Sequence, residues 1–175
     1  MGVDSTQRGV AMGIALAAIV AAIVLGADWA FLPFGVPHLE GLVGRIGYVL
    51  RADLFIYLWL AAAVANVACL RFFSPADIDG GGLAGASPKI HVGRAVLQNT
   101  LEQVVLAAGA HLALAATARG AVMVLVVPLV VLFCVGRLAF WLGYGRGAAH
   151  RAFGFAVTFY PTVFIYVLAL LLLIG

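Results

Sequence analysis

Charged residues are scarce in this sequence. They make up 10% of its 175 residues, whereas 65% are apolar, and the mean hydropathy is +1.16. A soluble domain carries about 25% charged residues, so this chain has too little polar surface to cover a water-soluble globule. The high hydrophobicity also excludes intrinsic disorder, which requires low hydrophobicity and high charge. The length favours one compact membrane unit over several domains.

Motifs for several common chemistries are also missing. The two cysteines, Cys69 and Cys134, lie in apolar segments, and they fit neither a metal-site spacing nor a disulfide framework. The sequence contains no Walker, Rossmann, zinc or Ser-His-Asp pattern. The ten basic residues are scattered rather than gathered in a run, which argues against nucleic acid as a partner.

Long apolar runs are present in their place. A helix that crosses a bilayer needs about 20 mostly apolar residues, and lipid offers no partner for an unpaired backbone group, so such runs should be helical. Five runs meet or approach this length, and we expect a helix in each: 10–25, 54–70 (beginning as early as 47), 96–118, 121–142 and 153–174.

The first run is interpreted as a retained signal-anchor helix, because its apolar part is long and no good cleavage site follows it. An interfacial loop with a short helix is expected around Pro33, Pro37, His38 and Glu40, and a glycine-rich loop around Gly80. Residues 1–50 are thus expected to hold a transmembrane helix and an interfacial loop, and the family resemblance given below implies that they are an addition to a four-helix bundle in 51–175.

Basic residues predict the orientation, because they are enriched in cytoplasmic loops. Five spans place the two termini on opposite sides. With the N-terminus in the cytoplasm, seven of the ten basic residues fall on that side, and Arg45, Arg51 and Arg119 on the other. The distribution favours an integral membrane protein with a cytoplasmic N-terminus, and we expect a bacterial inner membrane.

Two groups of polar residues are candidates for a functional site. Arg94, Gln98 and Glu102 lie at i, i+4 and i+8 on one helical side, and Asn99 is an i, i+3 neighbour of Glu102. Together they suit a small zwitterionic ligand with amino and carboxylate groups. The Asn-x-x-Glu spacing is also typical of a capping box, in which Asn99 would begin the helix.

The second group combines arginines with a tyrosine. Arg137 and Tyr144 share one helical face, Arg146 lies in the following connection, and Arg151 opens the last run. Arginine cannot act as a base at pH 7, but it can hold an anion, and a cation beside a thiol lowers the thiol pKa from about 8.5. The alternative is that these arginines contact lipid phosphates.

Other polar residues in the runs have simpler interpretations. His111 is expected to contact a neighbouring helix, and Pro161 is expected to kink the last helix. Glu102 is taken as the only acidic residue within the spans, which gives little support to a transporter.

The two polar groups together resemble the MAPEG superfamily, the membrane-associated proteins in eicosanoid and glutathione metabolism. The resemblance rests on Asn99-x-x-Glu102 in one helix and on Tyr144 separated by six residues from Arg151, and it covers about residues 51–175. It implies a four-helix membrane bundle, a homotrimer, and a glutathione site near the cytoplasmic face. Active members conjugate or reduce lipophilic electrophiles with the glutathione thiolate.

The resemblance also implies roles for single residues. Arg151 and Tyr144 would act on the thiolate, and Asn99, Glu102, Arg137 and Arg146 would bind glutathione. Arg94 and Gln98 are added to the binding residues because they share one helical side with Glu102. Three positions depart from the family pattern: Ala95, Gln103 and Phe140 stand where polar residues are frequent. Two functions are therefore considered, a glutathione-dependent transferase or peroxidase, and a non-catalytic lipid-binding or structural subunit whose added N-terminal helix would suit docking to a partner.

Overall fold

The computed structural model describes residues 4–31, 39, 41–80 and 86–175. The described chain is all-helical, as predicted, with five segments long and apolar enough to cross a membrane. The helices are α1 (Ser5–Phe31), α2 (Gly41–Phe72), α3 (Pro88–Thr117), α4 (Val126–Tyr144) and α5 (Ala148–Ile174), and a 3₁₀ helix, η1 (Gly120–Leu125), precedes α4. The loop expected at Pro33, Pro37, His38 and Glu40 and most of the glycine-rich loop lie outside the described residues.

The helices extend beyond the predicted runs. The run expected from 96 belongs to α3, which begins at Pro88, and the run expected from 153 belongs to α5, which begins at Ala148. The predicted limits followed apolar composition, whereas the helices continue through polar residues at their ends. The domain boundary predicted at residue 51 also falls inside α2.

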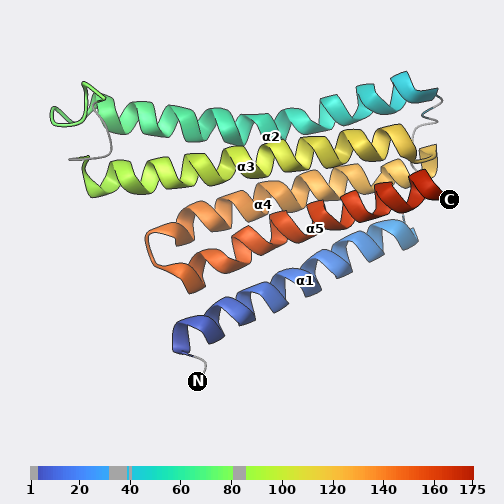
Figure 1. Ribbon diagram of the computed structural model, residues 1–175, viewed down its shortest axis with the longest axis horizontal. Helices are drawn as coiled ribbons and strands as arrows, with labels where there is room; N and C mark the ends of the chain where they lie inside the picture. Colours follow the sequence, from blue (N-terminus) through green and yellow to red (C-terminus); the bar gives the residue numbers. More distant parts are fainter. Residues whose placement is uncertain (1–3, 32–38, 40, 81–85) are drawn as a thin grey trace.

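The helices form two hairpins and one added helix. Figure 1 shows α2 beside α3, α4 beside α5, and α1 on the outer side of α5. The two termini lie at opposite ends of the bundle, as five spans require. The start of α1, the α2–α3 connection and the short α4–α5 turn share one end, so the two predicted polar groups are brought to the same end of the molecule.

Small residues let α1 approach α5 closely. A Cβ atom added at Gly9 would lie 2.7 Å from Cβ of Ala149, and one added at Gly13 would lie 3.0 Å from the backbone nitrogen of Phe153. Small residues four apart allow such contacts between membrane helices. Ala17, one turn further along α1, is 1% exposed. The added helix is therefore packed on the bundle from its first turns.

The approach of α4 to α5 is closer still. A Cβ at Gly154 would meet the carbonyl oxygen of Gly136 at 2.6 Å and Cα of Phe140 at 2.7 Å. Backbone therefore lies directly against backbone at this crossing. The consequence for the site is that the α5 carbonyl groups come within reach of α4 side chains.

A buried polar pair joins α2 to α3. Nδ1 of His111 lies 2.7 Å from Oδ1 of Asp53, and the two side chains are 2% and 1% exposed. The helix contact predicted for His111 is thus confirmed. The expectation that Glu102 is the only acidic residue within the spans is wrong, because Asp28 and Asp53 also lie inside helices of spanning length. Asp53 was missed because it directly precedes the apolar run at 54–70.

A small hydrogen-bonded turn orders the described part of the α2–α3 connection. Oδ2 of Asp77 accepts a hydrogen bond from the Ser74 hydroxyl at 2.6 Å, and Oδ1 accepts one from the Ser87 backbone N–H at 3.0 Å. These bonds favour the ionised carboxylate and lower the pKa of Asp77. Asp77 thereby connects the end of α2 to the residue that precedes α3.

Candidate functional site

A cavity of about 440 Å³ lies at the end of the bundle where the polar groups meet. It contains three of the predicted site residues, Asn99 from α3, Tyr144 from α4 and Arg151 from α5. The other lining residues are apolar: Val10, Ile14, Ala95, Phe140, Ala148, Ala152 and Phe155. Three helices thus bring together residues far apart in the sequence, and α1 supplies part of the wall.

Arg151 and Tyr144 face each other in this cavity. The guanidinium carbon of Arg151 lies 4.4 Å from the centroid of the Tyr144 ring, which is a cation–π contact. The Tyr144 ring also meets the Phe140 ring edge-on, with centroids 5.4 Å apart. Stacking on the tyrosine holds the arginine in place, and no side-chain hydrogen bond from Arg151 is recorded within the described residues. The charge is therefore available to an anion in the cavity.

Arg137 lies behind the cavity rather than on its wall. Its side chain is 1% exposed, and Nη1 donates a hydrogen bond of 2.8 Å to Oδ1 of Asn99. Nη2 donates to the Thr158 hydroxyl at 2.9 Å and to the Gly154 carbonyl at 3.4 Å. The guanidinium also stacks on Phe140, 4.5 Å from the ring centroid. Arg137 therefore orients Asn99, while its guanidinium contacts only neutral groups and its Nε has no hydrogen-bond partner among the described residues.

Glu102 and Gln98 lie beside the cavity, on the exposed face of α3. Nε2 of Gln98 donates to Oε1 of Glu102 at 3.0 Å, and Nδ2 of Asn99 lies 3.5 Å from Oε2 of Glu102. Neither Gln98 nor Glu102 lines the cavity. Asn99 links both sides, because it contacts Glu102 on one side and Arg137 on the other.

The capping-box alternative for Asn99 and Glu102 is wrong. A cap must stand at the first residues of a helix, but α3 begins at Pro88, and Asn99 lies well inside it. The side chain of Asn99 contacts other side chains in place of a free backbone N–H.

The remaining predicted residues lie further out. Arg94 is half-buried on α3, and Arg146 is exposed in the α4–α5 turn. Neither contributes to the cavity wall. Sequence reasoning also missed Thr158 and Gly154, which hold Arg137. The sequence does place a small residue and a hydroxyl residue four positions apart in α5, which is a pattern that could have pointed to them. Only the packing of α5 on α4 shows which arginine they contact.

The fold and site define a polytopic helical membrane protein with a mainly apolar cavity near one end of the bundle, into which three polar residues converge. The MAPEG family model matches residues 46–171, which include α3, η1 and α4 and most of α2 and α5. The chain belongs to the MAPEG family. The match begins five residues before the predicted boundary, and α1 lies outside it.

One relative among curated proteins is Transmembrane protein 79 of Mus musculus. It is 27% identical to this chain over 157 residues, which are 84% of this chain and 38% of that protein. The chain thus spans well under half of this relative's length. No solved structure matches the chain significantly.

Proposed function

We propose that this protein is a glutathione-dependent transferase or peroxidase that acts on lipophilic electrophiles. The observation that carries the proposal is the convergence of Asn99, Tyr144 and Arg151 on one cavity. Its volume of about 440 Å³ lies within the range of about 300–1,000 Å³ for small-molecule sites. Membership of a glutathione-linked family supports the same assignment.

The lining residues fit part of a glutathione molecule. Arg151 is the only charged residue among the described residues that line the cavity, so it suits one anionic group. Asn99 and Tyr144 add an amide and a hydroxyl. Glutathione with an ionised thiol carries three anionic groups, so if Arg151 holds the thiolate, the groups that bind the two carboxylates have to come from outside this cavity.

The exposed face of α3 supports a homotrimer as the complete form of the site. Glu102 and Gln98 are exposed within a helix of spanning length, and a carboxylate that faces lipid is costly. A neighbouring subunit packed on this face would cover Glu102 and place Gln98 and Arg94 close to a subunit boundary. The cavity of one subunit and the polar face of α3 at the subunit boundary would then form one binding site.

Bound glutathione would supply a thiol as the nucleophile. The positively charged guanidinium of Arg151 attracts an anion in the cavity, and so it favours the thiolate form of glutathione over the thiol form. Lowering a thiol pKa by about 2 corresponds to stabilising the thiolate relative to the thiol by about 2.7 kcal/mol. A hydrogen bond to a charged group contributes about 1.5–3 kcal/mol, which is of this size. Tyr144 positions Arg151 and donates its hydroxyl, while Arg137 positions Asn99.

The first experiment asks whether glutathione binds. A ligand at about 100 times its Kd stabilises the folded state by about 2.7 kcal/mol, so millimolar glutathione should raise the Tm in detergent by several degrees. S-methylglutathione, which keeps the peptide but cannot form a thiolate, is measured in the same way. Comparison of the two Tm shifts separates binding of the peptide from binding of the thiolate. If millimolar glutathione leaves the Tm unchanged, the proposal is wrong.

The second experiment tests Arg151. Arg151→Ala should lower the rate of glutathione conjugation to a model aryl halide about 100-fold at pH 7, because the thiolate fraction falls about tenfold for each rise of one in pKa. The rate should recover at high pH, and the oligomeric state should be unchanged. Arg119→Ala, which removes an exposed arginine at the other end of the bundle, is the control. Wild-type turnover in Arg151→Ala would contradict the role.

One observation favours a non-catalytic lipid-binding or structural subunit as a second candidate. Ala95 and Phe140, which replace frequent polar residues of the family pattern, both line the cavity. They make its wall more apolar than a tight peptide site requires. Absence of a glutathione effect on the Tm, with the trimer intact, would favour this function. The distribution of basic residues supports a cytoplasmic N-terminus, whereas it does not bear on the bacterial inner membrane expected as the location.

A further inference from the structure

Two side chains of α1 line the cavity that contains Arg151. Among the described residues of this cavity wall, only Val10 and Ile14 lie outside the matched family region, 46–171. Both are half-buried. Neither side chain carries a hydrogen-bonding group, so neither can bind the carboxylates, the amine or the amides of a peptide. What they can contact in this cavity is the apolar part of a bound molecule.

The helix packing places these two side chains beside Arg151. A Cβ added at Gly9 would lie 2.7 Å from Cβ of Ala149, and one added at Gly13 would lie 3.1 Å from Cβ of Ala152. The two glycines directly precede the two aliphatic residues of the wall, and their contacts on α5 fall on either side of Arg151. The α1 part of the wall is therefore at the same height along α5 as the arginine.

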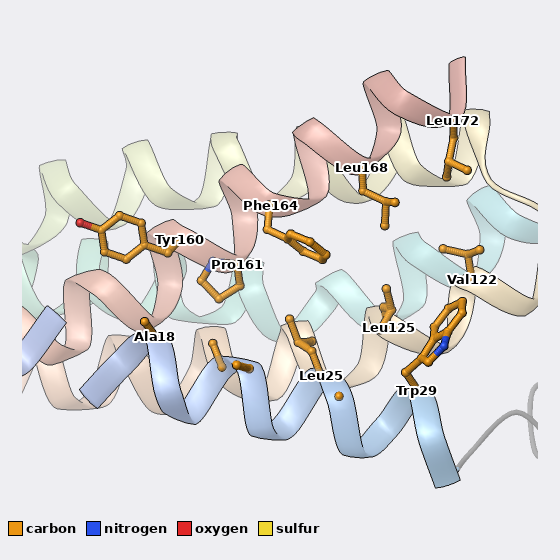
Figure 2. A pocket seen from close by; sticks show the side chains of 13 residues that line it. Ala18, Leu25, Trp29, Val122, Leu125, Tyr160, Pro161, Phe164, Leu168 and Leu172 are labelled. Atoms are coloured by element: carbon orange, nitrogen blue, oxygen red, sulfur yellow. The ribbon is translucent and has the colours of Figure 1, made fainter. Parts of the chain in front are cut away.

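This part of the wall is rigid for two reasons. Valine and isoleucine branch at Cβ, and in a helix such side chains keep largely to one rotamer of χ1. The backbone behind them is held by the two glycine contacts, which leave little room between α1 and α5. Figure 2 shows looser packing further along, where a cavity of about 670 Å³ lies between the two helices beside Leu25 and Phe164. Of these two regions, α1 is held more closely at the height of the site.

A rigid apolar wall beside the reacting group limits the size of the apolar reactant. In the proposed reaction the electrophilic carbon has to reach a thiolate held at Arg151, so the remainder of the electrophile has to fit against the neighbouring wall. One methylene more or less in an apolar pocket changes a rate about 10–200-fold. Side chains that cannot turn away therefore exclude a bulky electrophile more strongly than a compact one.

We propose that Val10 and Ile14 determine the specificity of the site for its lipophilic electrophile, and that they select compact electrophiles over bulky ones. This inference rests on the proposed function, because only that function brings an electrophile to Arg151. The selection is a property of the added helix, since α1 lies outside the matched family region.

The experiment compares benzyl chloride with 1-(chloromethyl)naphthalene, which carry the same reacting carbon on a small and a large ring system. In both reactions the glutathione sulfur forms a bond to the CH₂ carbon, the carbon–chlorine bond breaks, and chloride leaves with the bonding electrons. The measured quantity is the ratio of the naphthyl rate to the benzyl rate, after subtraction of the reaction without protein. Ile14→Ala removes the branched end of the side chain and should raise this ratio about tenfold.

Ile19→Ala is the matched control for this substitution. It removes the same atoms from the outer face of α1, where Ile19 is 56% exposed, and it should leave the ratio unchanged. The Tm of each variant is measured first, because Ile14 also packs against the buried cluster that contains Ala17 and Ala156. If Ile14→Ala lowers the Tm, Val10→Ala replaces it, since Val10 is not part of that cluster. An unchanged ratio in a folded cavity variant would overturn the proposal.

A second readout does not require glutathione. Ala148→Cys places a thiol on the cavity wall, one helical turn before Arg151, in a protein whose native cysteines are removed by Cys69→Ser and Cys134→Ala. This thiol is labelled with N-ethylmaleimide or with the bulkier N-(1-pyrenyl)maleimide. Ile14→Ala should raise the ratio of the pyrenyl rate to the ethyl rate about tenfold.

The labelling separates the two ways in which the proposals can fail. If the wild-type protein does not conjugate glutathione but Ile14→Ala raises the labelling ratio, the proposed function is wrong and the size limit stands. If Ile14→Ala leaves the labelling ratio unchanged, the size limit is refuted, whatever the result with glutathione.

Discussion

Gly154→Ala is expected to destabilise the protein by about 3 kcal/mol, at the upper end of the cost of overpacking. The added methyl group would lie 2.6 Å from the carbonyl oxygen of Gly136 and 2.7 Å from Cα of Phe140. Backbone atoms in packed helices cannot turn away as a side chain can, so α4 and α5 must separate. Separation also withdraws the Gly154 carbonyl and Thr158 from Arg137. Unfolding in a titration with denaturing detergent measures the loss.

Gly47 provides the control for this substitution. It also lies within a helix of spanning length, but nothing lies within 4 Å of a Cβ added there. Gly47→Ala should therefore be neutral or slightly stabilising, because alanine is a better helix former by about 1 kcal/mol. If Gly154→Ala unfolds at the same detergent concentration as the Gly47 variant, the close α4–α5 approach is wrong.

His111→Leu is expected to destabilise the protein by about 3 kcal/mol. The substitution leaves the Asp53 carboxyl group 1% exposed and without the partner that lies 2.7 Å away in the native protein. Oδ2 of Asp53 has no partner among the described residues even in the native protein. An unpaired acid at membrane depth costs about 2.5–3.5 kcal/mol, and breaking a buried pair by removing one member costs about 3–5 kcal/mol.

The double variant Asp53→Leu/His111→Leu should recover most of this loss. Replacing a buried ionic pair with apolar residues is often neutral or stabilising, because no polar group is left unsatisfied. Asp53→Leu alone leaves the buried His111 ring without its partner, and should cost about 1–2 kcal/mol. The four unfolding free energies form a double-mutant cycle. If the free-energy cost of the double variant equals the sum of the costs of the two single variants, Asp53 and His111 do not interact.

Part of the candidate site was predictable from local spacing. Gln98 and Glu102 were expected on one side of a helix, and they form a hydrogen bond. Asn99 and Arg151 were expected to act together, and both line the 440 Å³ cavity. Helical periodicity accounts for the first result, since residues four apart are neighbours on any helix. The second came from a family resemblance, because no spacing rule relates residues on different helices.

The rest of the site depended on contacts between helices. Arg137 was predicted to bind ligand, and only the packing shows that its guanidinium also holds Asn99 and Thr158, while its Nε has no partner among the described residues. Asp53 was not recognised, because a single acid beside an apolar run looks like a helix end until its partner is known. The contribution of Val10 and Ile14 to the cavity wall was unexpected, because α1 lies outside the matched family region.

The sequence by itself determined that this protein is a bundle of membrane-crossing helices. Hydrocarbon cannot satisfy backbone hydrogen bonds, so each long apolar run has only the helix available to it. Only the tertiary structure decided which helix lies against which. In lipid, apolar side chains gain little from choosing one neighbour over another, and the choice depends on shape and on a few polar contacts. Gly9, Gly13 and Gly154 set the close contacts between neighbouring helices.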